Sequence, residues 1–406
     1  MKIGFVCCEY PPGPHGGIGT VTQMLARALS RAGHEVRVAG VYSPGYPAAD
    51  FEMDQGVQVW RLRESLAPLG WLVARVRLYR LVANWVRSGE LDLVEFPDYQ
   101  GWAAGWPHLA VPVIVRQHGS ETYFAAELQR PVHTVSFWLE RAALRRSDFS
   151  CSVCEYTARK TQEVFSLGSR CDAILYNPVE PVAAPRSWNG SARVIFTGTL
   201  TAKKGVISLI RAWPEVIAKC PDAELHVYGK DGRAEGGGSM REFLRSQLPD
   251  NARPTVLFHD YVPRAAILKE LAEAGAAVFP SYTETFAMAP LEAMVCGCPT
   301  IYSRRGSGPE LMVDGRHGLL IEPDRPQEIA DAIVLLLRDR ELAQSLGAAG
   351  RERASNVFSM EKLLPENVEF YRRCVEAFRG PKKSGWYAKA SKLDVQDKVT
   401  ENLRTA

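Results

Sequence analysis

The chain has 406 residues, of which 46% are hydrophobic and 23% are charged. This length exceeds what one ordinary hydrophobic core organises, so we expect a globular protein of two domains. The formal net charge of +3 is too small to indicate nucleic-acid binding, and we expect no nucleic-acid partner. No apolar run approaches the roughly 20 residues that cross a bilayer. The opening apolar stretch is too short for a signal peptide, so the sequence predicts a cytoplasmic protein.

Strand and helix patterns alternate along the first half of the chain. Apolar or alternating runs predict strands at 2–8, 34–39, 57–62, 91–96, 111–117 and 148–153. Apolar residues at helical spacing predict helices at 19–32 and 71–87. Such alternation is typical of a parallel sheet that helices cover on both faces.

A segment rich in proline and glycine, residues 177–192, reads as a linker to a second alternating half. The same patterns predict strands at 193–196, 223–228, 256–258, 276–279 and 300–302, and helices at 206–217, 327–338, 341–354 and 360–378. We therefore expect two doubly wound sheets in series. Ligands of such sheets bind at the carboxyl ends of the strands.

The most informative segment runs from Tyr282 to Met294 and contains two glutamates, Glu284 and Glu292. The apolar run before it predicts a buried strand, and Pro290 suits the first turn of a helix. Glu284 is thus expected in a loop at the end of a strand, and Glu292 inside the next helix. The N–H groups at the start of that helix can hold a phosphate, which leaves one carboxylate for a sugar and the other for ribose hydroxyls. This layout suits a nucleotide-sugar.

Several further motifs stand in order around this segment, at residues 196–205, 226–229, 258–262 and 306–318. Together they resemble the retaining glycosyltransferases of the GT-B fold, family 4 (group 1). The first half resembles that family more loosely, through residues 16–19, 117–119 and 176–180. The resemblance implies two Rossmann-like parallel-sheet domains that face each other across a cleft. It also implies a retaining hexosyltransferase that needs neither cofactor nor metal.

On this resemblance we assign residues 1–182 to an acceptor-binding domain and 193–360 to a nucleotide-sugar-binding domain. Residues 361–379 are expected to form a helix that packs back toward the first domain. Residues 380–406 are a basic tail that we expect to be disordered.

The resemblance assigns catalytic roles to Glu284, Lys204 and His118. It assigns donor binding to Gly16, Gly17, Thr199, Lys203, Gly229, Tyr261, Val262, Phe286, Ala287, Met288 and Glu292. Preorganised cations and N–H groups are the main means of stabilising a departing diphosphate, and Lys204 occupies the position of the family's lysine.

The sequence departs from the family pattern at several of these positions. Thr199 stands where the family has an arginine, and Thr285, Ala287 and Asp260 stand where glycines are common. The missing positive charge leaves open a non-catalytic, donor-binding member. An epimerase or phosphorylase on the same fold is a second alternative. The Gly16–Gly19 loop lacks the third glycine of a dinucleotide fingerprint, so NAD binding is disfavoured.

Position alone suggests two further features. Glu95 and Asp98 follow a strand and could meet the acceptor, which the sequence leaves as a glycan, a lipid-linked glycan or a small molecule. The helix predicted at 71–87 carries several arginines and could contact an anionic membrane at its inner face, although a packed helix with a solvated face is the commoner case. Fold analogy favours surface-glycan or other polysaccharide synthesis.

Overall fold

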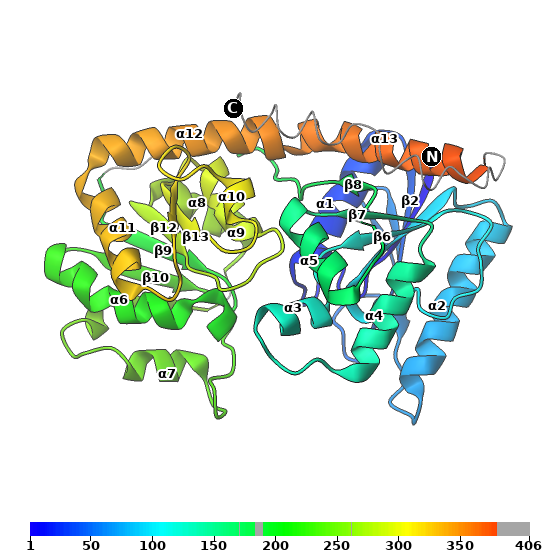
Figure 1. Cartoon of the computed structure of the whole chain (residues 1–406), viewed down its shortest axis with the longest axis horizontal. Coiled ribbons are helices and arrows are strands. Elements are labelled where there is room, and N and C mark those ends of the chain that lie inside the picture. Colours follow the sequence, from blue (N-terminus) through cyan, green and yellow to red (C-terminus); the bar gives the residue numbers. More distant parts are fainter. Residues whose placement is uncertain (170, 183–189, 261, 380–406) are drawn as a thin grey trace. The chain divides into compact units, whose positions relative to one another are not determined.

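The computed structural model describes residues 1–169, 171–182, 190–260 and 262–379. Tyr261 and the predicted tail therefore lie outside the described residues. The chain divides into two compact units, of which one contains Met1–Pro178 and the segment that begins at Met360, and the other contains Val179–Ser359. In each unit helices flank a central sheet (Figure 1).

The first unit contains a sheet of eight strands in the order β3-β4-β2-β1-β5-β6-β7-β8. The strands are β1 (Lys2–Val6), β2 (Glu35–Tyr42), β3 (Phe51–Asp54), β4 (Val57–Arg63), β5 (Leu93–Pro97), β6 (Val113–Gln117), β7 (Phe149–Ser152) and β8 (Ala173–Ile174). Seven are parallel, and six of these were predicted. The sequence did not reveal the short parallel β8 or the antiparallel edge strand β3. Gln55 and Gly56 join β3 to β4 with φ of 49° and 85°, the left-handed geometry of a two-residue hairpin.

Helices cover both faces of this sheet. They are α1 (Gly17–Arg31), α2 (Gly70–Arg87), α3 (Glu121–Glu127), α4 (Thr134–Arg146), α5 (Glu155–Phe165) and α13 (Met360–Arg379), with a 3-10 turn η1 (Tyr99–Gly101). Alternate residues of the buried strands point to opposite faces. Val94 and Phe96 pack with α2 and α4 in one apolar cluster, whereas Leu93 packs with α1 and α13 in another.

The second unit contains a sheet of six strands in the order β11-β10-β9-β12-β13-β14, with every neighbouring pair parallel. The strands are β9 (Arg193–Thr197), β10 (Glu224–Tyr228), β11 (Val256–His259), β12 (Ala276–Phe279), β13 (Thr300–Ser303) and β14 (Leu319–Ile321). The chain builds outward from β9 in one direction, then crosses back to β12 and builds in the other. The strand order therefore reverses between β9 and β12, the point at which doubly wound sheets bind ligands.

The helices of this unit are α6 (Val206–Lys219), α7 (Met240–Ser246), α8 (Arg264–Glu273), α9 (Met288–Val295), α10 (Gly308–Leu311), α11 (Pro326–Arg338) and α12 (Arg340–Phe358). Two 3-10 turns accompany them, η2 (Ala202–Lys204) and η3 (Arg253–Thr255). Trp213 of α6 is fully buried and anchors a core with strand residues such as Val194 and with α11. Across the described ranges of both units, no helix combines the length and apolarity that a membrane crossing requires.

Candidate active site at the switch between β9 and β12

The loops that follow β9 and β12 meet because the two strands are neighbours. Gly205 ends η2 with φ of +70°, and a Cβ at this position would overlap the carbonyl oxygen of Pro280. Only glycine allows this close approach. The backbone N–H of Tyr282 then donates to the carbonyl of Lys203 at 2.8 Å. These contacts fix η2 against the loop that carries Glu284.

Lys204 and Glu284 meet as a result. The Lys204 ammonium forms an ion pair with Glu284 Oε1, and the Ser281 hydroxyl donates to the same oxygen at 3.2 Å. The two charged side chains retain 25% and 11% of their exposure, so the pair is accessible but largely sheltered. Gly306 also packs against the Glu284 backbone, where a Cβ would approach its carbonyl oxygen to 2.8 Å. The structure thus unites two of the three residues predicted to be catalytic.

Glu292 lies inside α9, as predicted, and has a partner that sequence analysis missed. Arg264 Nε, at the start of α8, donates to Glu292 Oε1 at 2.5 Å. The same guanidinium lies 3.6 Å from Glu180 Oε2. The sequence gives no local pattern that pairs Arg264 with Glu292, because the two residues stand 28 positions apart. The pairing depends on the packing of α8 against α9.

The start of α9 separates the two glutamates. Its N-cap residue, Ala287, makes no side-chain capping hydrogen bond. Phe286 is buried and its ring packs against Phe358 at 5.4 Å between centroids, which holds the loop down. Met288 is half-buried at the first helical position. The loop therefore presents the helix start between the two carboxylates, as the sequence predicted.

The remaining predicted donor residues of this unit surround the same strand ends. Gly229 has φ of +156° and packs on Gly198 so closely that a side chain would overlap the Gly198 carbonyl. Thr199 is exposed and Val262 is half-buried. Asp260 pairs with Arg241 at 2.9 Å. The base-contacting role of Tyr261 falls outside the described residues.

In the first unit, Asp98 fixes the backbone of His118. The carboxylate accepts the N–H groups of His118 at 2.9 Å and Gly119 at 3.2 Å. Burial of both side chains shapes their protonation: desolvation raises the pKa of Asp98 to about 8 and lowers the pKa of His118 to about 3. His118 is therefore a neutral imidazole at ordinary pH. Asp98 therefore positions His118, the residue predicted to contact the sugar, by holding the backbone of His118.

Glu95 has a structural setting. Its carboxylate accepts from Arg116 Nε at 2.8 Å and from the Tyr371 hydroxyl at 2.7 Å, and all three side chains are buried. Asn367 accepts from Arg116 Nη2 at 2.7 Å. The cluster ties α13 to β5 and β6. Both oxygens of the Glu95 carboxylate accept hydrogen bonds within this cluster, which favours a structural role for Glu95. Contact of Glu95 or Asp98 with the acceptor stays a prediction.

Gly16 and Gly17 lie at the start of α1, with Gly16 as the N-cap. Glu9, which sequence analysis missed, places Oε1 2.7 Å from the N–H of Gly19. A Cβ on Gly16 would come within 3.3 Å of the same carboxylate, whereas one on Gly17 would meet nothing within 4 Å. The Glu9 carboxylate thus accepts a hydrogen bond from a free N–H group in the first turn of α1.

Glu140 is a third residue that sequence analysis missed. It is fully buried in α4 and accepts N–H groups of Glu121 at 3.0 Å and Thr122 at 3.1 Å. It thereby caps α3, the helix that follows His118. A glutamate in the middle of a helix gives no local sequence signal for this long-range capping.

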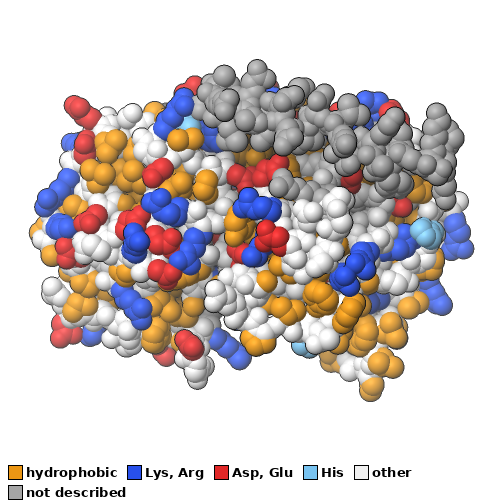
Figure 2. Space-filling model, viewed as in Figure 1, with side chains coloured by type: hydrophobic (Ala, Val, Ile, Leu, Met, Phe, Trp, Pro, Cys, Tyr) orange, Lys and Arg blue, Asp and Glu red, His pale blue; other side chains and the backbone are white. Residues whose placement is uncertain are grey.

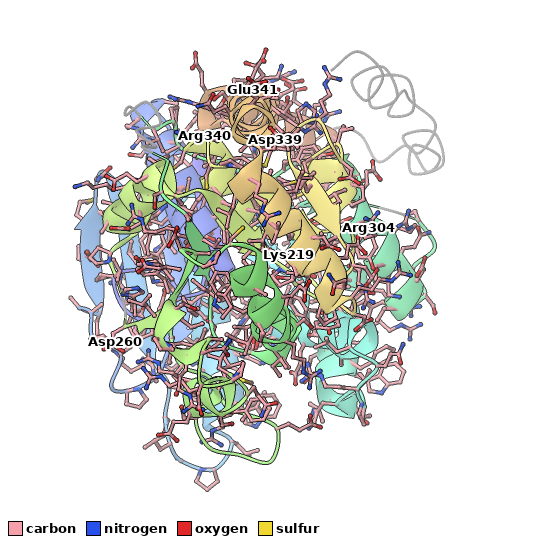
Figure 3. All side chains as sticks on the ribbon, turned by 90° about the vertical axis from the view of Figure 1, so that its left-hand side faces the viewer. Lys219, Asp260, Arg304, Asp339, Arg340 and Glu341 are labelled. Atoms are coloured by element: carbon pink, nitrogen blue, oxygen red, sulfur yellow. The ribbon has the colours of Figure 1, made fainter. Side chains whose placement is uncertain are left out.

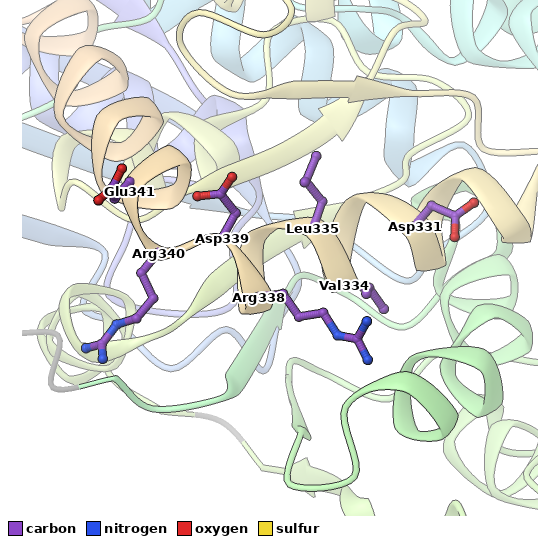
Figure 4. Close-up of a pocket in the computed structure, with 7 residues that line it drawn as sticks. All are labelled: Asp331, Val334, Leu335, Arg338, Asp339, Arg340 and Glu341. Atoms are coloured by element: carbon purple, nitrogen blue, oxygen red, sulfur yellow. The ribbon is translucent and has the colours of Figure 1, made fainter.

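An open hollow lies elsewhere in the second unit, where α11 meets α12 (Figure 4). Its lining residues are Asp331, Val334, Leu335, Arg338, Asp339, Arg340 and Glu341. Asp339 to Glu341 stand well apart from Asp260 at the β11 end (Figure 3). The Arg338 guanidinium donates to the carbonyl of Lys219, the last residue of α6, at 2.5 Å. The hollow therefore lies at the helix ends, where the strands begin, and shares no residue with the Lys204–Glu284 site.

The described residues contain no group of three or more His, Cys, Asp or Glu side chains placed to hold a metal. The cation that contacts Glu284 in the structure is the ammonium of Lys204. Whether transfer needs a metal stays a prediction.

Two family models match the chain in sequence order. The model described as "Glycosyl transferase 4-like domain" matches residues 16–174, and "Glycosyl transferases group 1" matches residues 191–339. The chain belongs to the group 1 glycosyltransferases. This assignment agrees with the sequence resemblance and with the position of Glu284 and Glu292 in the second matched region.

Similar proteins support the assignment of the chain to this glycosyltransferase family. A glycogen synthase of Mycobacterium tuberculosis is 27% identical over 417 residues, which cover 94% of this chain and 97% of the relative. Sucrose-phosphate synthase from Thermosynechococcus elongatus has a similar structure, with a TM-score of 0.72, 21% identity and coverage of 92% and 99%. Anabaena HepE in complex with UDP-glucose gives a TM-score of 0.69 at 18% identity, covering 92% and 100%. The structural neighbours confirm the predicted GT-B fold class.

Proposed function

We propose that this glycosyltransferase moves a hexosyl group from a nucleotide-sugar to an acceptor hydroxyl with retention of anomeric configuration. The observation that carries the proposal is the Lys204–Glu284 pair, held at the strand-order reversal beside the start of α9. The donor belongs in the Val179–Ser359 unit, and the acceptor belongs with the other unit.

The diphosphate is the part of the donor that needs most stabilisation, because negative charge grows on it as the glycosidic bond breaks. Lys204 supplies a positive charge, and the N–H groups at the start of α9 supply aligned dipoles. Glu284 then turns from Lys204 toward sugar hydroxyls, and Glu292 accepts ribose hydroxyls. The ligand phosphate replaces Glu284 as the partner of the ammonium.

The reaction must also remove the proton of the acceptor hydroxyl. His118 is neutral and cannot donate a proton as an imidazolium at ordinary pH, because burial lowers its pKa to about 3. We infer a front-face route in which the bond from the anomeric carbon to the donor phosphate breaks. The acceptor oxygen forms its bond on the same face, and the leaving phosphate oxygen takes the acceptor's proton. No cofactor or metal enters this scheme.

A transfer assay tests this proposal. Full-length protein is incubated with nucleotide-sugars labelled in the sugar, UDP-glucose first because a structural neighbour binds it, and with glycan acceptors. The expected result is label in the acceptor with the anomeric configuration of the donor. Inverted product, isomerised donor or sugar phosphate would each contradict it. We also propose a role in polysaccharide or surface-glycan synthesis. The identity of the acceptor that becomes labelled tests this role.

The exposed Thr199 favours one alternative, a member that binds the donor without transfer, because a hydroxyl cannot neutralise phosphate. The same assay separates the two functions. Nucleotide binding without labelled acceptor, across a broad acceptor panel, would indicate the non-catalytic member.

A further inference from the structure

The largest concentration of exposed apolar side chains lies at the start of α2. Six of the fifteen large hydrophobic residues that the described ranges leave exposed stand here, and we call them the apolar tip: Leu66, Leu69, Trp71, Leu72, Val73 and Val76. Leu66 is 89% exposed and Leu69 62%. Monomeric proteins rarely leave so compact a set of large apolar side chains in water without an interaction to serve.

A second helix end extends this surface. Val132, Val135 and Trp138, at the start of α4, are also exposed. The turn η1 links the two helices, because Arg75 of α2 donates to the carbonyl of Gly101 at 2.8 Å and Glu140 of α4 accepts from the N–H of Gln100 at 3.3 Å. Figure 2 shows the resulting hydrophobic side chains gathered at the lower end of α2 and α4.

Positive charge follows the apolar tip along α2. Arg77, Arg80 and Arg87 are exposed, and none forms an ion pair with a carboxylate within the described parts of the chain. Residues 65–89 contain no Asp or Glu. Leu72, Val76 and Arg80 recur every four residues and share one face, so Arg80 lies about 12 Å along the axis from Leu72.

We propose that the apolar tip docks on an anionic lipid bilayer, with Arg77 and Arg80 against the headgroup phosphates. Interfacial helices bury apolar residues about 5–10 Å into the boundary of the headgroups and acyl chains, and arginines beside them contact anionic lipid. The gradient from apolar residues to arginines matches this depth profile. Trp71 and Trp138 suit the same boundary, where tryptophan is enriched.

Charge argues against a second copy of this chain as the occupant. A two-fold contact through the apolar tip would bring the same surface of both copies together. The arginines of α2 would then face arginines, with no acidic residue in 65–89 to pair with them. An anionic surface complements this charge, whereas a second copy repels it.

Vesicle cosedimentation of the full chain tests the proposal. Vesicles of phosphatidylcholine alone and of phosphatidylcholine mixed with phosphatidylglycerol are compared at low and high salt. One variant makes the tip polar with Leu69→Asn, Leu72→Gln and Val76→Gln; Asn suits position 69, where φ is +64°. A second carries Arg77→Gln and Arg80→Gln. Leu335→Gln is the matched control, since Leu335 is 42% exposed on α11 and Leu72 is 45% exposed.

We expect the wild-type chain and Leu335→Gln to bind the mixed vesicles equally, and more weakly at high salt. The polar variant should partition at least about tenfold less. The arginine variant should lose about fivefold per charge on mixed vesicles only. Circular dichroism and thermal unfolding establish that the variants are folded.

Three outcomes would overturn the proposal. Wild-type protein could fail to bind the mixed vesicles. The folded polar variant could bind them as well as wild type, which would place the contact elsewhere in the chain. Sedimentation velocity could instead reveal a dimer that the polar variant loses, which would assign the surface to a second copy.

Discussion

The ammonium of Lys204 is paired with the carboxylate of Glu284, 80 residues further along the chain. The pair exists because β9 and β12 are neighbours and because Gly205 lets their following loops touch. It joins the proposed phosphate-binding charge to the proposed sugar-binding carboxylate in one contact.

Replacement of Lys204 with Gln should lower kcat by about 10²–10³, because the charge stabilises the leaving diphosphate more in the transition state than in the ground state. The free energy of unfolding should change by less than about 1 kcal/mol, since the ion pair remains partly exposed. Lys219→Gln is the control, because it also removes an ion pair, with Asp331 at 2.9 Å, but at the far end of α6. Equal loss of kcat in both variants would contradict the assignment.

Glu292→Gln should raise the Kd for the nucleotide about tenfold, because ribose hydroxyls lose a charged acceptor. Isothermal titration with the nucleoside diphosphate measures it. Glu180→Gln touches the same Arg264 at the longer distance of 3.6 Å and should leave the Kd unchanged. A matching rise in both variants would mean that Arg264, not ribose binding, explains the effect.

Gly205→Ala should unfold or severely destabilise the second unit, by more than about 3 kcal/mol, since the added Cβ overlaps Pro280. Gly315→Ala is a matched control: Gly315 has the same φ of +70°, with nothing within 4 Å of an added Cβ. Its cost should be only the left-handed strain of about 1–2 kcal/mol. Thermal or denaturant unfolding compares them, and similar losses would show that the Gly205–Pro280 approach is unimportant.

The free energy of unfolding should depend on pH through His118. Burial lowers its native pKa to about 3, against about 6.5 when unfolded. The unfolded state therefore binds a proton first as pH falls, and the stability that this group contributes above pH 6.5 is lost between about 6.5 and 3. Between pH 7 and 4.5 the wild-type chain should lose about 2 kcal/mol more than His118→Gln. Parallel losses in denaturant titrations would disprove a buried, neutral imidazole.

Tyr371→Phe should reduce the stability of the first unit by about 1–2 kcal/mol, because the buried carboxylate of Glu95 loses its 2.7 Å hydrogen bond. Tyr79→Phe, at a half-buried tyrosine of α2, is the control and should cost little. A structural role also requires that kcat stay within about twofold. A large loss of transfer in the folded Tyr371→Phe variant would instead connect this cluster with catalysis.

The sequence predicted the strands and helices that have clear periodicity, and it predicted Glu284 and Glu292 on the correct sides of a helix start. Periodicity and the proline of α9 are local signals, so local reasoning was sufficient. It missed the antiparallel β3, the two-residue β8 and the three-residue β14. It also missed six helices, namely α3, α4, α5, α7, α8 and α10. It also missed Arg264, Glu9 and Glu140, whose partners are set by packing between distant segments.

Contacts between distant segments also explain why the two acidic residues at the end of β5 have different roles. Glu95 and Asp98 stand three positions apart, and sequence position alone gave both a share in acceptor binding. In the structure Glu95 is saturated by Arg116 and Tyr371, whereas Asp98 holds the backbone of His118. Only the fold of α13 onto the sheet separates these roles.

The most direct test of the central claim is the thermal shift of wild-type and Lys204→Gln protein with UDP, GDP, ADP, CDP and dTDP. A ligand that binds the native state raises Tm by mass action. We predict that at least one nucleotide raises the Tm of the wild-type chain and that the same nucleotide raises the Tm of Lys204→Gln distinctly less. If none of the five raises the wild-type Tm, or if the shift is equal in the variant, the diphosphate site at Lys204 is contradicted.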